Sequence, residues 1–167
     1  MKRIKALLLF TALVGVVTLN SCKKDKTTVA VSLTADIDGS ATNFSVSPVA
    51  LQGSVDGQTF TVIQGATSAG ATLSITVAGA ITAGKTYSDA AASDNDKPLF
   101  LYATSATADD YLNDDDDASN LPSITITSVT STTIDGTFKG KVALTSGDMP
   151  VKSITNGKFH VNIQTHP

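Results

Sequence analysis

The sequence predicts an all-β fold, an antiparallel β-sandwich of about eight or nine short strands. Residues 27–167 contain 22 Thr and 16 Ser but no Arg, Glu or Trp. Thr fits a half-exposed pleated surface, whereas the residues that usually cover helices are absent or sparse. Apolar residues also recur at alternate positions, with Gly- or Asp-containing breaks between the runs. A calycin-like small β-barrel is the alternative, since one sequence does not reveal the strand order.

The predicted elements follow this pattern along the chain. Residues 29–37 alternate apolar and polar side chains and form the first strand. Asp38-Gly39 predicts a turn, and Phe44 and Val46 begin a return strand that Pro48 limits. Further strands are expected at residues 58–64, 72–81, 98–104, 122–131, 133–144 and 157–165. Further breaks are expected at Asp56-Gly57, Ala83-Gly84-Lys85 and Gly147-Asp148.

Length and charge indicate one acidic domain, at residues 28–167. This length is sufficient for a chain to bury its own core without metal or disulfide support. The sequence holds 12 Lys plus Arg and 15 acidic residues, and three of the basic residues lie within its first five positions. Without those three the net charge is −6. A nucleic-acid partner is not expected, because phosphate recognition needs a basic face.

The first 21 residues have the parts of an export signal. A cationic start precedes an apolar stretch at residues 6–19, and Ser21 precedes Cys22, the only cysteine. Those 14 residues are fewer than the roughly 20 that a membrane-spanning helix needs. We therefore expect residues 1–21 to be a signal peptide rather than a membrane span.

Leu19, Ser21 and Cys22 resemble a bacterial lipobox, although Asn20 stands where a smaller residue is commoner. The resemblance implies cleavage before Cys22 and acylation of its thiol and its freed α-amine. Two or more acyl chains anchor a protein durably, whereas one chain binds reversibly. Residues 22–27 are therefore expected to be a lipidated tether, and the membrane is the expected partner of Cys22.

The run Ser-Cys-Lys-Lys-Asp-Lys at residues 21–26 resembles the start of lipoproteins from the Bacteroidetes. The resemblance implies attachment to the outer membrane. In that group, short charged runs after the cysteine direct surface export and are usually richer in acid than this one. The prediction therefore leaves the periplasmic side and the cell surface both open.

The second half of the chain resembles the end of a lipoprotein domain family of unknown function in the same bacteria. Two motifs carry the resemblance, an I-x-G-x-F strand and a terminal T-N-G-x-F strand; "DIDGSATNFS" near residue 40 fits the family's opening. The matching positions are Ile134, Gly136, Phe138, Thr155, Asn156, Gly157 and Phe159. We interpret the motifs as Gly-centred turns that deliver an inward Phe, which supports a fold and leaves function undefined.

Acidic residues gather in two predicted loops, at residues 94–96 and 109–117. Clustered Asp and Asn oxygens suit calcium, although the spacing does not match an EF-hand loop. The candidate calcium ligands are Asp109, Asp110, Asp114, Asp115, Asp116 and Asp117. Tyr111 and Asn113 lie in the same loop and are candidate contacts to a glycan or an envelope protein. A solvated, charged loop is the alternative interpretation.

The sequence favours a non-enzymatic protein. It lacks a Gly-x-Ser-x-Gly elbow, and its only histidines are His160 and His166. His160 alternates with Phe159 and Val161, which places it on the solvated face of its strand. We expect a lipid-anchored binding or structural module of the cell envelope. A calcium-dependent glycan- or protein-binding module and a hydrolase are the alternatives.

Overall fold

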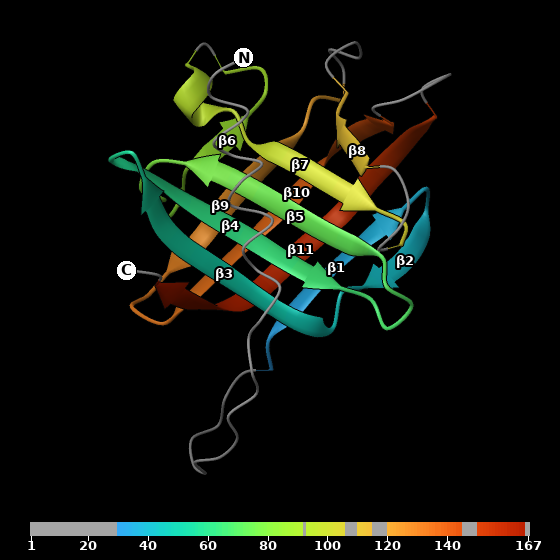
Figure 1. Ribbon diagram of the computed structural model, residues 1–167, viewed down its shortest axis with the longest axis horizontal. Coiled ribbons are helices and arrows are strands. Elements are labelled where there is room, and N and C mark those ends of the chain that lie inside the picture. Colours follow the sequence, from blue (N-terminus) through green and yellow to red (C-terminus); the bar gives the residue numbers. More distant parts are fainter. Residues whose placement is uncertain (1–29, 92, 106–109, 115–119, 145–149, 166–167) are drawn as a thin grey trace.

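The computed structural model describes residues 30–91, 93–105, 110–114, 120–144 and 150–165. Figure 1 shows these residues as a sheet structure with one short 3-10 helix. The elements in chain order are β1 (Ser32–Ile37), β2 (Ser40–Asn43), β3 (Val46–Val55), β4 (Gln58–Ala66), β5 (Thr72–Ala78), β6 (Thr86–Ser88), η2 (Asp94–Asp96), β7 (Leu99–Ala103), β8 (Asp110–Asn113), β9 (Ser123–Val129), β10 (Thr133–Leu144) and β11 (Val151–Thr165).

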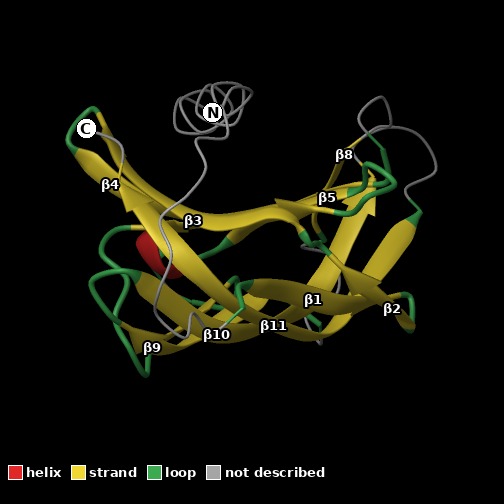
Figure 2. Ribbon diagram, turned by 90° about the horizontal axis from the view of Figure 1, so that it is seen from below, coloured by secondary structure: helices red, strands yellow, loops and turns green. Residues whose placement is uncertain are grey.

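The strands form two packed layers, which Figure 2 shows edge-on. One layer contains β3, β4, β5 and β7, and the other contains β2, β1, β11, β10 and β9. The strand order is β2-β1-β11-β3-β4-β5-β7-β8-β10-β9-β6, and β10 also pairs with β11. The hydrogen bonds therefore close into a ring that runs from β11 through β3 and β8 to β10. The layers correspond to the expected sandwich, and the ring has the closure of the alternative barrel.

The predicted all-β class is confirmed, and two of the predicted turns have the expected geometry. Asp38 and Gly39 have φ values of 51° and 79°, and Asp56 and Gly57 have values of 52° and 77°. A type I′ turn requires positive φ at both central residues, and its twist matches the right-handed twist of the two strands that it joins. Gly147-Asp148 lies outside the described residues.

Three predictions about strand limits are wrong. Pro48 does not limit β3, because a register shift between Val46 and Val49 accommodates it within the strand. The loop predicted around Tyr111 contains β8, which pairs with β7 and β10. β11 begins at Val151 rather than at Gly157, because β10 supplies a partner along its first half.

The core lies between the layers and contains the two Phe residues of the C-terminal motifs. Phe138 packs edge-on against Phe100, with ring centroids 6.1 Å apart, and lies 6.3 Å from Phe159. Gly136 faces Phe159 across β10 and β11, and Gly157 faces Phe138 in the same register. The predicted Gly-centred turns are therefore wrong. Both glycines lie within strands, where the missing Cβ leaves room for the opposite ring.

Candidate binding site

The outward surface of β1, β11 and β10 is mostly polar, and Val151 at the start of β11 is its exposed large apolar residue among those described. Inward residues of these strands alternate with outward polar ones, as the period of two requires. We define the polar face by eight of the outward residues of these strands: Ser32, Thr34, Asp36, Asp135, Thr137, Asn156, Lys158 and His160. Hydrogen-bonding groups from three strands therefore share one exposed surface.

One end of the polar face is hollowed. The hollow has a volume of about 270 Å³ and lies over β1, β2 and the bend in β11. Its lining residues are Thr34, Ala35, Asp36, Ala41, Thr42, Asn43 and Asn156. Asp36 faces Ala41 and Thr34 faces Asn43 across the β1–β2 hairpin. The hairpin register thus brings a carboxylate, a hydroxyl and an amide to one side of the sheet.

A bulge in β11 supplies the remaining polar group of the hollow. Thr34 pairs with Lys158 but Asp36 pairs with Thr155, so β11 has an extra residue at this point. A β-bulge redirects a side chain from its regular position. Asn156 lies in the bulge at φ 52°, a left-handed conformation that Asn adopts more readily than most residues. Its Nδ2 donates to Asp36 Oδ2 at 2.7 Å.

The hollow retains hydrogen-bonding capacity. The Asn156 amide occupies one oxygen of Asp36, and a carboxylate can accept at both oxygens. Within the described part of the chain, the side chains of Thr34 and Asn43 make no hydrogen bond. The hollow can therefore offer acceptors from Asp36, both donors and acceptors from Asn43, and a hydroxyl from Thr34.

The β1–β2 turn beside the hollow is tied to β11 by an ion pair. Lys152 Nζ donates to Asp38 Oδ2 at 2.7 Å, and the Ser153 backbone N–H donates to Asp38 Oδ1 at 2.9 Å. The Lys152 hydrogen bond, followed by that of Ser153, lowers the pKa of Asp38. The same bond raises the pKa of Lys152. Exposed pairs of this kind contribute at most about 1 kcal/mol, so the bond mainly orients the turn.

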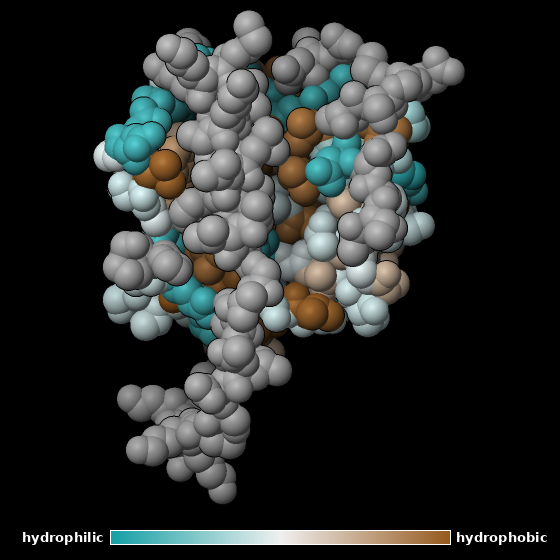
Figure 3. Space-filling model, in the orientation of Figure 1, coloured by the Kyte–Doolittle hydropathy of each residue, from teal (hydrophilic) through white to brown (hydrophobic). Residues whose placement is uncertain are grey.

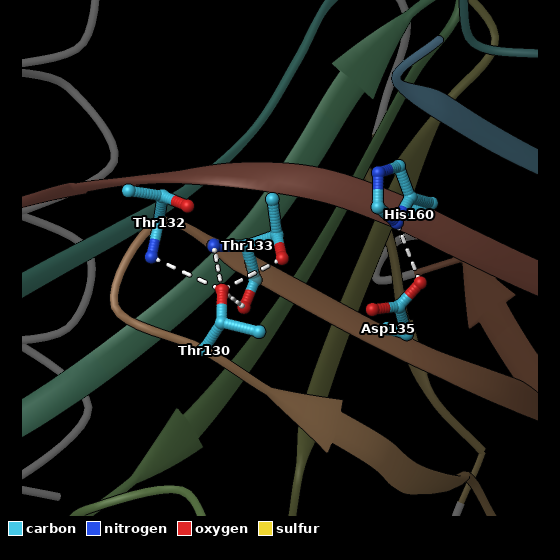
Figure 4. Close-up of polar contacts among 5 residues, drawn as sticks. All are labelled: Thr130, Thr132, Thr133, Asp135 and His160. Carbon is cyan, nitrogen blue, oxygen red and sulfur yellow. Dashed lines mark hydrogen bonds and ion pairs between the residues drawn. The ribbon is translucent and has the colours of Figure 1, made fainter. Parts of the chain in front are cut away.

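The other end of the polar face carries a His–Asp pair, shown in Figure 4. His160 Nδ1 lies 2.6 Å from Asp135 Oδ1, and the two residues are direct cross-strand partners. Ser32 faces His160 from β1. The outward position predicted for His160 is confirmed. The row contains the residue types of a hydrolase triad, but in the described chain the Ser32 hydroxyl makes no hydrogen bond to His160.

A threonine turn fixes the start of β10 next to this pair (Figure 4). Thr130 Oγ1 accepts hydrogen bonds from the backbone N–H groups of Thr132 and Thr133, at 3.2 and 2.9 Å. It also lies 2.8 Å from Thr133 Oγ1. Local side-chain bonds of this type close a turn. The threonines here therefore have a structural role.

The candidate calcium ligands are only partly described. Asp110 begins β8 and is exposed, and Asp114 is 9% exposed with its N–H bonded to Lys141 O at 3.1 Å. Asp109, Asp115, Asp116 and Asp117 lie outside the described residues. Over the described ranges, no three His, Cys, Asp or Glu side chains come close enough together to hold a metal ion. The calcium hypothesis stays a prediction.

Tyr111 and Asn113, the candidate ligand contacts, both have structural partners. Tyr111 is 9% exposed and packs against Tyr102, with ring centroids 6.0 Å apart. The Asn113 amide oxygen accepts from Phe100 N, and its Nδ2 donates to Asp89 Oδ2 and Pro98 O, each at 2.8 Å. Neither side chain projects as a free recognition group. Asn113 instead ties the segment before β7 to β8.

The smaller acidic cluster is partly neutralised by lysines. Asp96 pairs with Lys85 at 2.6 Å, and Asp94 pairs with Lys97 at 3.6 Å. The bond to Asp96 raises the pKa of Lys85. Lys85 also lies 4.6 Å from the centre of the Tyr87 ring. These contacts stabilise the 3-10 turn at residues 94–96. They do not arrange its carboxylates around a common ligand position.

The outward surface of the opposite layer differs from the polar face. Leu51 and Val62 face each other across β3 and β4, and the row continues through Thr76 on β5 to Leu99 on β7. Val62 and Thr76 are buried, whereas Leu51 and Leu99 are half-buried. Apolar side chains are visible on this side of the molecule in Figure 3. The two layers thus present chemically different surfaces.

Comparison with known proteins gives no assignment. No family model matches the chain, and no significantly similar curated protein or solved structure was found. Within the described residues, no helix has the length and apolar composition needed to cross a membrane. Cys22 and the predicted tether lie outside the described residues.

Sequence reasoning missed the hollow because its groups are far apart in the chain. Asp36 and Asn156 are separated by 120 residues, and only the pairing of β1 with β11 brings them together. One signal was present in the sequence. Asn156-Gly157 interrupts an alternating strand, and such a pair often marks a turn or bulge.

Proposed function

We propose that the protein is a lipid-anchored binding module of the cell envelope that acts without catalysis. The lipobox-like sequence ending at Cys22 carries the proposal, because acylation there would fix the chain to a membrane. Nine residues, 23–31, separate Cys22 from Ser32, the first residue of β1. Nine extended residues span at most about 30 Å, so the domain would stay close to the bilayer.

The polar face supports a binding role. Its groups come from three hydrogen-bonded strands, which hold the side chains in fixed positions. The side chains of the His160–Asp135 pair are 21% and 31% exposed on the outward side of the sheet, where water would compete for a reacting group. A binding or structural module therefore fits the polar face better than a hydrolase.

Replacing Cys22 with Ser tests the anchor in the native host. We expect the wild-type protein to sediment with the membranes, whereas Cys22→Ser should lose most of this association because no thioether-linked lipid can form. Fractionation followed by immunodetection measures the distribution. Asp25→Asn is the matched control in the tether and should sediment like the wild type. Undiminished sedimentation of Cys22→Ser would contradict the lipid anchor.

Protease treatment of intact cells determines on which side of the membrane the domain lies. Cleavage only after lysis indicates the periplasm and favours a structural role in the envelope. Cleavage on intact cells indicates surface display and favours capture of an external glycan or protein. A lysed sample shows in both cases that the domain can be cleaved.

A further inference from the structure

We propose that the hollow over β1, β2 and the β11 bulge binds a carbohydrate through two neighbouring hydroxyl groups. This proposal rests on the binding function proposed above and names the ligand class and the site. The lining residues of the hollow carry one carboxylate (Asp36), two amides (Asn43 and Asn156) and two hydroxyls (Thr34 and Thr42). The Thr42 hydroxyl already donates to Ser40 O at 3.1 Å. These groups come from β1, the β1–β2 hairpin and β11, so the fold itself assembles them.

The arrangement of donors and acceptors matches hydroxyl groups. A sugar hydroxyl donates one hydrogen bond and can accept others, so it needs an acceptor and a donor side by side. Asp36 supplies acceptors only, and Asn43 and Asn156 each supply donors and an acceptor. Asn156 already donates to Asp36 at 2.7 Å, which holds the carboxylate in place before a ligand arrives. Such preorganisation reduces the cost of binding.

The size and floor of the hollow also fit one sugar ring. Its volume is about 270 Å³, and Ala41, which faces Asp36 across the hairpin, has a methyl side chain on the same side of the sheet as the polar groups. Small apolar residues can lie under the C–H groups of a ring while the polar groups engage its hydroxyls. A ligand of about 12 heavy atoms in an open, hydrated site should bind with a Kd of about 1 mM.

The charge of the hollow argues against a divalent cation. Calcium takes about six to eight oxygen ligands and favours several carboxylates. Among the lining residues only Asp36 carries a carboxylate, and one of its oxygens bonds to Asn156. A neutral, hydroxyl-rich ligand can bind while the hydrogen bond from Asn156 to Asp36 stays in place.

Chemical-shift mapping of the full-length protein tests the site. The protein is kept in a detergent without a sugar headgroup and titrated with methyl mannoside, methyl galactoside, methyl glucoside and N-acetylglucosamine, each to about 100 mM, well above the expected Kd. We expect at least one sugar to shift the side-chain amide signals of Asn43 and Asn156. The absence of such shifts with all four sugars would overturn the proposal.

Variants separate specific recognition from changes in folding. Asp36→Asn should weaken binding about 10-fold or more, because it replaces a charged acceptor. Asn43→Ala should weaken it several-fold without affecting the fold, since the Asn43 side chain has no hydrogen bond in the described chain. Asp56→Asn, in the exposed β3–β4 turn, is the matched control and should bind like the wild type.

Two further outcomes would contradict the carbohydrate proposal. If Asn43→Ala binds sugar as tightly as the wild type, the sugar does not lie in the hollow. If millimolar calcium chloride alone shifts the same amide signals, the hollow is a cation site. Neither result bears on the lipid anchor, which the Cys22→Ser experiment tests separately.

Discussion

Replacing Gly157 with Ala is expected to lower the free energy of unfolding by about 3 kcal/mol. A Cβ at this position would lie 2.5 Å from the Phe138 carbonyl oxygen and 2.5 Å from its Cδ2. Atoms in a close-packed interior approach to about 3.5–4 Å, so the ring or the strand would have to shift. Gly157 is buried within β11, and β10 lies directly opposite. Denaturant unfolding of the two proteins measures the difference.

A double-mutant cycle with Phe138→Leu tests the cause. Phe138→Leu alone should be destabilising, because it removes part of a ring that contacts both Phe100 and Phe159. In combination, the smaller side chain should relieve part of the Gly157→Ala clash, so the two effects should not add. Lys158→Ala, the exposed neighbour, should change stability by less than about 0.5 kcal/mol. Full additivity would show that the Phe138 ring is not the source of the clash.

Replacing Asn113 with Asp is expected to destabilise the protein by about 3 kcal/mol at pH 7. The Asn113 Nδ2 donates to Asp89 Oδ2 and to Pro98 O, both at 2.8 Å. A carboxylate would place an acceptor against two acceptors, one of them charged. Asn113→Ala removes the three hydrogen bonds without this repulsion and should cost less. Thermal unfolding of both variants gives the comparison.

The Asn113→Asp effect should also depend on pH. Repulsion from Asp89 raises the pKa of the introduced carboxyl group in the folded protein above its value in the unfolded chain. The folded protein therefore takes up a proton first, and the loss of stability should shrink as the pH falls through that raised pKa. Asn95→Asp, at an exposed position in η2, is the control. Equal losses for Asn113→Asp at pH 7 and pH 4 would contradict the proposed contact with Asp89.

The sequence predicts best those strands that bury only one face. In β1 and β10 an apolar residue alternates with a polar one, and the burial in the structure alternates in step. β8, at Asp110–Asn113, lacks this alternation, since its two apolar residues are adjacent, and it is short and lies in an acidic run. Its strand conformation depends on hydrogen bonds to β7 and β10, which no local pattern reveals.

The sites depend on strand register, and register is set by long-range pairing. Asp36 and Asn156 meet only because β1 pairs with β11, and the bulge moves Asn156 out of the regular alternation. Asn113 shows the reverse case. Its place beside acidic residues suggested ligand binding, but the fold directs its amide toward Phe100, Pro98 and Asp89.

The intact mass of the protein extracted from its native membranes tests the lipid anchor most directly. The anchor predicts a chain that begins at Cys22, with the mass of residues 22–167 plus a diacylglyceryl group and, where the α-amine is modified, a third acyl chain. The Cys22→Ser protein should show no added lipid mass. A wild-type protein that retains residues 1–21, or that begins at Cys22 without any acyl group, would contradict the account.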